Sequence, residues 1–160
     1  MTPEPTQTSV STTPTNNYAG FLERFLASLI DSVLTGIISF VIGMVGGIMG
    51  ALVTGMSDNG SQAASLFQGL SSLVAWLLGV AYYIYFTGSR GQTLGKMAMK
   101  IKVVKITTKT HPTYLDAFLR EVVGKIVSTI TLGIGYLWML WNPQKQTLHD
   151  KIAGTVVVKA

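Results

Sequence analysis

A long apolar stretch has an arginine near its start and an aspartate in its interior. Arg24 and Asp31 lie within residues 21–50, FLERFLASLIDSVLTGIISFVIGMVGGIMG. Their spacing of seven residues is two helical turns, so both lie on one helix face, together with Ser28 and Thr35. A carboxylate in hydrocarbon is costly unless it is paired or functional. This pattern therefore predicts an intramembrane site for a proton or a cation.

The Asp31 carboxylate needs a partner other than Arg24. At 1.5 Å of rise per residue, the two residues are about 10 Å apart along the helix axis. Lys125, Arg120 or His149 could supply a charge. A desolvated carboxylate can hold a proton near neutral pH and exchange it for a cation held by nearby hydroxyls. The alternative is a structural role, as one member of an ion pair or as a helix cap.

A second candidate site is the pair His149-Asp150 near the end of the sequence. A His beside an Asp is typical of metal sites and general bases. However, the sequence has two His and no Cys, so no dense set of metal ligands exists. We expect Asp150 to pair with a cation or to accept backbone N–H groups, and we expect no metal and no cofactor. No phosphate-binding loop, catalytic triad or paired catalytic carboxylates occur, so we expect no enzyme.

The composition favours lipid as the solvent of this chain. The 160 residues are 48% hydrophobic and 12% charged. An average soluble domain has about 25% charged residues. The net charge of +5 could indicate nucleic-acid binding. The basic residues nevertheless cluster beside apolar segments, which favours an anionic membrane surface over nucleic acid. The sequence thus predicts a small all-α membrane protein.

The chain divides into a tail and one membrane domain. Residues 1–17 are polar and rich in Pro and Thr, without the features of a signal peptide, and we expect a disordered tail there. Residues 18–160 form the predicted domain. Its three apolar segments, each a predicted transmembrane or re-entrant helix, are 25–53, 65–86 and 118–141.

Glycines in the first segment have the spacing that lets two helices approach closely. Two overlapping GxxxG pairs are present. Their partner could be the second segment or another copy of the chain, and we expect a homo-oligomer through these faces, made by Gly43, Gly46, Gly47 and Gly50.

The distribution of basic residues predicts the orientation in the membrane. The linker 55–64 has no Lys or Arg, whereas the loop after the second segment is basic. By the positive-inside rule, that loop and the N-terminus are cytoplasmic, in a multi-pass protein of the cell membrane. We expect the loop to face anionic lipid through Arg90, Lys96, Lys100, Lys102 and Lys105.

An internal repeat predicts where the end of the chain lies. QTLGKMAMKIKVVK (92–105) and QTLHDKIAGTVVVK (146–159) align without gaps. Similar segments belong on the same side of the membrane, where their VVK strands could form a two-stranded pairing. Because about 20 residues cannot cross a bilayer twice, we expect 118–141 to be re-entrant, turning near 131–135 and leaving the C-terminus cytoplasmic.

The third segment opens with signals of a helix start. Thr113 and Asp116 have nearly the spacing of a capping box. Asp116 and Arg120, and then Glu121 and Lys125, are four residues apart, which predicts two ion pairs along one helix in the interface.

Four stretches together resemble one known family. YAGFLERFLASLID, GQTLGKMAMKIKVV, FLREVVGKI and QTLHDKIAGTVVV, in this order, are similar to the RDD family of membrane proteins, named for one arginine and two aspartates. The resemblance assigns these to Arg24, Asp31 and Asp150. It implies a bacterial or archaeal membrane protein with about three membrane segments. For some members of the family, cation/proton antiport has been suggested.

Two functions follow as hypotheses. The first is a small transporter that moves a cation or small solute in exchange for protons through Asp31, with Arg24 and Asp150 closing the site and Ser28, Thr35 and Lys125 supporting it. The second is a membrane module that does not transport but binds a partner protein or an anionic lipid. In that case the Arg and Asp residues hold the fold.

Overall fold

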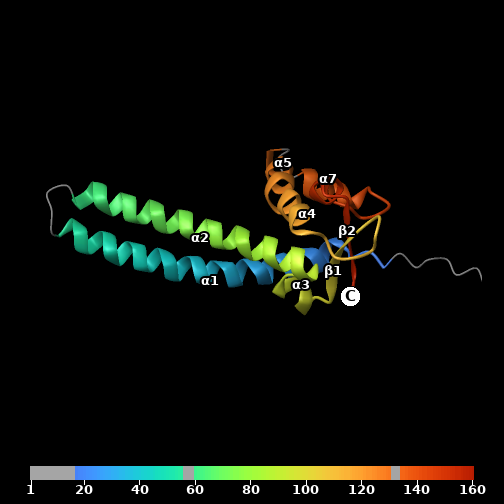
Figure 1. Ribbon diagram of the computed structural model, residues 1–160, viewed down its shortest axis with the longest axis horizontal. Helices are drawn as coiled ribbons and strands as arrows, with labels where there is room; N and C mark the ends of the chain where they lie inside the picture. The colour runs from blue at the N-terminus through green and yellow to red at the C-terminus, as the bar shows by residue number, and fades with distance from the viewer. Residues whose placement is uncertain (1–16, 56–59, 131–133) are drawn as a thin grey trace, which may run out of the picture.

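The computed structural model describes residues 17–55, 60–130 and 134–160. Its largest feature is a hairpin of two helices that lie side by side, α1 (Phe21–Thr54) and α2 (Gly60–Arg90) (Figure 1). They are about 50 and 45 Å long, more than the roughly 30 Å of a bilayer's hydrocarbon core. Most of their large apolar side chains are exposed. Both helices are long and apolar enough to cross a membrane, and they contain the first two predicted segments.

Small residues let the two long helices approach closely. A Cβ on Gly50 would lie 3.2 Å from the Ala64 Cα, and one on Gly46 would meet the Ser71 side chain. The GxxxG pair of Gly46 and Gly50 therefore packs α1 on α2 within one chain. A Cβ on Gly43 would meet nothing within 4 Å. Gly43 and Gly47 thus remain for self-association, which stays a prediction that crosslinking in membranes would test.

A small sheet forms at the end of the hairpin that carries Phe21 and Arg90, which we call the base. Strands β1 (Ile101–Lys105) and β2 (Thr155–Lys159) pair antiparallel, with Val103 opposite Val157. The predicted pairing of the two VVK segments is confirmed. Residues from both strands, from α1 and from the segment before it form a buried core beneath the sheet, namely Ala19, Ala27, Ile101, Val103 and Val157.

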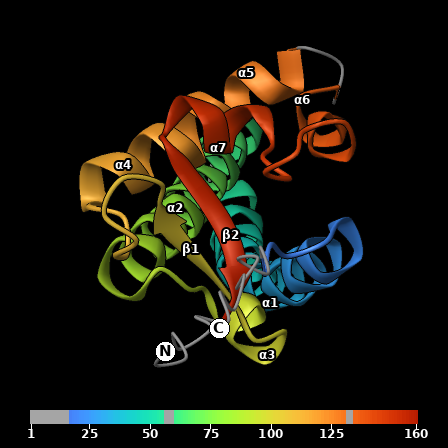
Figure 2. The same cartoon turned by 90° about the vertical axis from the view of Figure 1, so that its right-hand side faces the viewer.

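The two copies of the internal repeat have the same local structure. In each copy a Thr caps a five-residue helix, α3 (Leu94–Ala98) or α7 (Leu148–Ile152), by accepting the N–H of its third residue. The preceding Gln reaches forward to the first carbonyl of the following strand: Gln92 to Ile101 at 3.0 Å and Gln146 to Thr155 at 2.7 Å. Both copies lie at the base (Figure 2).

The third predicted segment is several short helices instead of one. They are α4 (Tyr114–Phe118), the π-helix η1 (Leu119–Gly124), α5 (Lys125–Ile130), α6 (Ile134–Leu137) and the 3₁₀ turn η2 (Trp138–Leu140). The continuous helical run, 114–130, is about 25 Å long, which is short of a crossing. Among the described residues only α1 and α2 meet the criteria of a span.

The chain nevertheless returns to the base after this segment, because α7 packs on η1 and β2 pairs with β1. That path agrees with a re-entrant course. Residues 131–133, in the predicted turn, lie outside the described residues, as do residues 1–16 of the predicted tail.

The π-helix changes which charges meet. The capping box of Thr113 and Asp116 is present, and Glu121 pairs with Lys125 as predicted. The Asp116–Arg120 pair was expected but does not form: Asp116 pairs with Lys105 at 2.9 Å, and Arg120 with a residue of α7. A π turn takes more residues per turn than an α turn, so it rotates Arg120 away from the Asp116 face.

Candidate functional site

The Asp31 carboxylate is buried and accepts three hydrogen bonds from uncharged groups. Its Oδ1 accepts from the Tyr82 hydroxyl and from the Gly95 N–H, both at 2.8 Å. Its Oδ2 accepts from the Thr93 hydroxyl. Gly95 allows this approach, because a Cβ there would lie 2.9 Å from the Asp31 Cγ. Asp31 therefore fixes the start of α3 against α1 and α2, and it forms no ion pair with a cation among the described residues.

Arg24 belongs to a different polar centre. Its Nη1 lies 2.6 Å from the Asp150 Oδ2, and its Nη2 donates to the Lys145 carbonyl at 2.7 Å. Arg120 approaches the same carboxylate from η1, with Nη2 3.0 Å from Asp150 Oδ1. Asp150 is fully buried. One carboxylate of α7 thus joins the start of α1 to η1.

The charge state of Asp150 follows from these neighbours. Burial favours its neutral form, but the positive charges of Arg120 and Arg24 outweigh this and hold the pKa of Asp150 well below its usual range. The carboxylate is therefore ionised at neutral pH. The three residues that the resemblance assigns, Arg24, Asp31 and Asp150, form two separate centres, one around Asp31 and one around Asp150.

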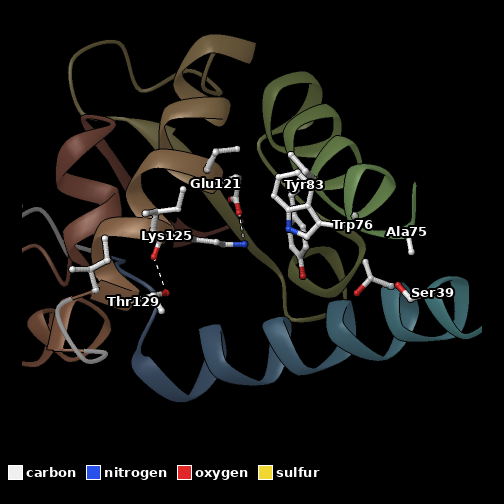
Figure 3. A pocket seen from close by; sticks show the side chains of 13 residues that line it. Ser39, Ala75, Trp76, Tyr83, Glu121, Lys125 and Thr129 are labelled. Carbon is white, nitrogen blue, oxygen red and sulfur yellow. Dashed lines mark hydrogen bonds and ion pairs between the residues drawn. The ribbon is translucent and has the colours of Figure 1, made fainter. Parts of the chain in front are cut away.

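The predicted supporting residues have local partners. The Ser28 hydroxyl donates to the Phe25 carbonyl at 2.7 Å, and the Thr35 hydroxyl to the Asp31 carbonyl at 2.9 Å, which is common for such residues in helices. The Lys125 ammonium lies 2.6 Å from the Glu121 carboxylate and 4.0 Å from the centre of the Tyr83 ring (Figure 3).

A cavity of about 330 Å³ lies at the base between these two centres. Its walls come from α1, α2, α3, η1, α5, α6, η2 and the segment around α7. We call it the base cavity. Four basic and two acidic side chains line it: Arg24, Lys96, Arg120, Lys125, Asp31 and Glu121.

Arg120 is a buried residue of this cavity with unused hydrogen-bonding capacity. It is 4% exposed, and its Nε and Nη1 have no hydrogen-bond partner among the described residues. The nearest acid to Nε is Glu121, at 3.9 Å, which is beyond a hydrogen bond. Buried N–H groups without an acceptor are rare and costly. Sequence reasoning treated Arg120 only as a partner for a carboxylate and missed this role.

Lys96 also lines the base cavity, although the sequence placed it on the lipid-facing basic loop. It forms no ion pair with any described residue. Burial is the main cause that lowers the pKa of Lys96 to about 8, and the positive charge of Arg120 adds to it. The rest of that loop differs: Arg90, Lys100 and Lys102 are exposed, and Lys105 is paired with Asp116.

His149 lies at the wall of the cavity and is neutral at physiological pH. Burial lowers the pKa of His149 to about 4. A ring nitrogen lies 2.9 Å from the Thr147 hydroxyl, and the backbone beside it packs on Gly124. No three His, Asp or Glu side chains gather into a metal-binding group in the part of the chain that the structure describes.

Several known proteins are similar to this chain in sequence. An uncharacterised protein of Rickettsia prowazekii is 39% identical over 80 residues, which are 50% of this chain and 43% of that protein. A proline-rich antigen homolog of Mycobacterium tuberculosis is 35% identical over 94% of this chain and 67% of its own length. An uncharacterised membrane protein of Bacillus subtilis is 37% identical over 54% of this chain and 52% of its own.

The chain thus spans less than half of the first of these relatives and about two thirds of the second. No solved structure matches. Residues 18–154 match the RDD family, which confirms the resemblance that the sequence motifs carry. With its apolar hairpin, its half-buried Arg24 and its buried Asp31 and Asp150, this chain belongs to the RDD family of membrane proteins.

Proposed function

We propose that this chain is a membrane module whose base cavity binds a phosphate-bearing anionic group. The observation that carries the proposal is the buried guanidinium of Arg120, of which two nitrogens face no acceptor in the described residues. A guanidinium presents its N–H donors in a planar fork that matches the oxygens of a phosphate. A bound oxyanion would give both nitrogens an acceptor.

The charges around the cavity support an anion as the ligand. Two acids, Asp31 and Glu121, line the cavity, and a third, Asp150, lies directly behind the two arginines. These three acids stand against four cations, Arg24, Lys96, Arg120 and Lys125. The acids at Glu121 and Asp150 are already paired at 2.6–3.0 Å. One positive charge is left in excess, and Lys96 is the cation without a carboxylate partner. This favours a ligand with a negative charge.

Transport through Asp31 has less support from the geometry. Three donors hold the Asp31 carboxylate, so they occupy three of its roughly four lone-pair sites and leave little room for a bound cation. The exchange of a proton for a cation stays a prediction, and the same contacts favour the structural alternative. We propose no chemical step in the cavity.

We place the base on the cytoplasmic side of the cell membrane, with the turn between α1 and α2 outside. The support is the basic character of segment 90–109 and the absence of Lys and Arg between the helices. Single cysteines at Ser61 and Lys109, in a chain without native Cys, would be labelled from opposite sides by a reagent that cannot cross membranes. Labelling of both from one side would refute this orientation.

Lys96→Met tests the anion site. We expect the affinity of the delipidated protein for glycerol phosphate to fall about tenfold or more, because a hydrogen bond to a charged group contributes roughly 1.5–3 kcal/mol. The measurement is the increase in melting temperature with ligand concentration. Lys96 forms no ion pair in the described residues, so the variant should fold.

Lys102→Met is the matched control, since Lys102 is exposed and its loss removes the same charge outside the cavity. Equal effects of the two substitutions would show only general attraction and would contradict the site. Repeating the titration at higher pH gives a second readout. Lys96 is charged below a pH of about 8, among Arg120, Glu121, Lys125 and Asp150, so affinity should fall above that pH.

A further inference from the structure

A second cavity, of about 530 Å³, lies beside the base cavity. We call it the groove. It runs between α1, α2 and the helix formed by η1 and α5, and its lining is mostly apolar (Figure 3). The parts used below are Trp76 and Gly79 of α2 and Ile126 and Ile130 of α5. Cavities of roughly 300–1,000 Å³ are the usual size for small-molecule sites.

The groove and the base cavity are adjacent. Both are lined by Tyr83, Glu121 and Lys125. The Lys125 ammonium, held by Glu121 and the Tyr83 ring, therefore marks the boundary between a cationic chamber and an apolar one. An amphiphile with an anionic head and an apolar tail has the same order of chemical groups.

The groove is also open along the side of the helical hairpin. Ile126 and Ile130 on its rim are 53% and 73% exposed, and Trp76 is 59% exposed. Since α1 and α2 are the candidate spans, this side faces hydrocarbon. A ligand can then reach the base cavity from within the bilayer, without leaving the membrane.

We infer that the ligand of the base cavity is an anionic phospholipid, whose phosphate lies against Arg120 and Lys96 and one of whose acyl chains lies in the groove. The inference rests on the proposed function and names the source of the phosphate. It is carried by the adjacency of the two cavities, the charge of one and the apolar lining of the other.

The chain offers a pair of glycines for a controlled test. A Cβ on Gly79 would meet nothing within 4 Å, so a leucine there would project into the groove without a clash with backbone. Gly69 lies on the same helix with equally open space and lines neither cavity. Gly79→Leu should fill the groove, and Gly69→Leu should not.

Trp76 provides a direct readout of an acyl chain in the groove. With Trp138 and Trp141, both exposed, replaced by Phe, Trp76 is the one tryptophan of the chain. The protein is placed in bilayer discs of phosphatidylcholine that contain a small fraction of one brominated lipid. The brominated lipid is phosphatidylglycerol in one sample and phosphatidylcholine in the other, at the same mole fraction. Bromine quenches tryptophan fluorescence on contact, so excess quenching by the anionic lipid reports its selective occupancy of the groove.

We expect brominated phosphatidylglycerol to quench Trp76 at least twofold more than brominated phosphatidylcholine. Gly79→Leu should abolish the excess, and Gly69→Leu should keep it. Lys96→Met should abolish it as well. Equal quenching by both lipids, while glycerol phosphate still binds in a Lys96-dependent manner, would refute the lipid inference and leave the anion site standing. Loss of Lys96 dependence in both assays would refute the proposed function itself.

Discussion

Replacing Asp150 with asparagine is expected to lower the free energy of unfolding by about 3–5 kcal/mol, which is the usual cost of leaving a buried charge without its partner. Asp150 is fully buried between Arg24 at 2.6 Å and Arg120 at 3.0 Å. Asparagine would leave two guanidinium groups without a counter-charge. The measurement is chemical or thermal unfolding of the purified protein in detergent.

Asp116→Asn is the control for this effect. Asp116 has the same position in a capping box, but its side chain is partly exposed and pairs with Lys105. Its replacement should cost about 1 kcal/mol, as for an ordinary cap. A double variant, Arg24→Gln with Asp150→Asn, should lose less than the sum of the single variants, because the two residues contact each other. Additive losses would contradict the buried ion pair.

The pH dependence of stability follows from the same carboxylate. The pKa of Asp150 is lowered in the folded protein, so the stability that it contributes is complete above the unfolded pKa of about 3.9. That stability is lost as the pH falls through the lower, folded value. Between pH 5 and 8 this residue should cause no change in stability.

Replacing Asp31 with alanine is expected to lower the free energy of unfolding by about 3 kcal/mol, because two buried donors, at Thr93 and Gly95, and the half-buried Tyr82 hydroxyl each lose an acceptor at roughly 1–3 kcal/mol. Asn at the same position should cost only about 1 kcal/mol. Its oxygen can still accept from Tyr82 and Gly95, and the Thr93 hydroxyl can turn to accept from the amide. Hydrogen exchange at the Gly95 N–H measures whether α3 is released.

This difference also tests transport. Asp31→Asn should keep the fold but cannot carry a proton at neutral pH. We expect everted vesicles with either wild type or Asp31→Asn to show the same background dissipation of a pH gradient when sodium, potassium or lithium is added. Cation-dependent flux in wild type that is lost in correctly folded Asp31→Asn would overturn the structural role and restore the exchange site.

The sequence allowed the fold to be predicted where a local signal was strong. The repeated Gln-Thr-Leu units implied that their strands lie together, and β1 pairs with β2. The length and apolar composition of the first two segments predicted α1 and α2. The third segment was predicted as one re-entrant segment, and its division into several short helices was missed, because hydropathy does not show a π turn such as Leu119–Gly124.

The site was harder to predict, because the hydrogen-bond partners of Asp31 carry no charge by which a search could find them. A search for a cation near Asp31 could not find Tyr82, Thr93 and the Gly95 N–H, which are neutral. Arg120 was assigned to Asp116 by its spacing of four residues, and only the π turn directs it to the base cavity. Such placements depend on tertiary packing, which cannot be predicted from the spacing of residues along one helix.

The pairing of Arg24 with Asp150 affects the order in which the hairpin inserts and the base closes during synthesis. The two residues are 126 positions apart in the chain. At roughly 5–20 residues per second, synthesis of the second follows the first by about 6–25 s. The helical hairpin is complete well before then and can insert while the Arg24 guanidinium is still hydrated. We therefore expect closure of the base to follow insertion of the hairpin, and a ribosome stalled before Asp150 to hold an inserted but open intermediate.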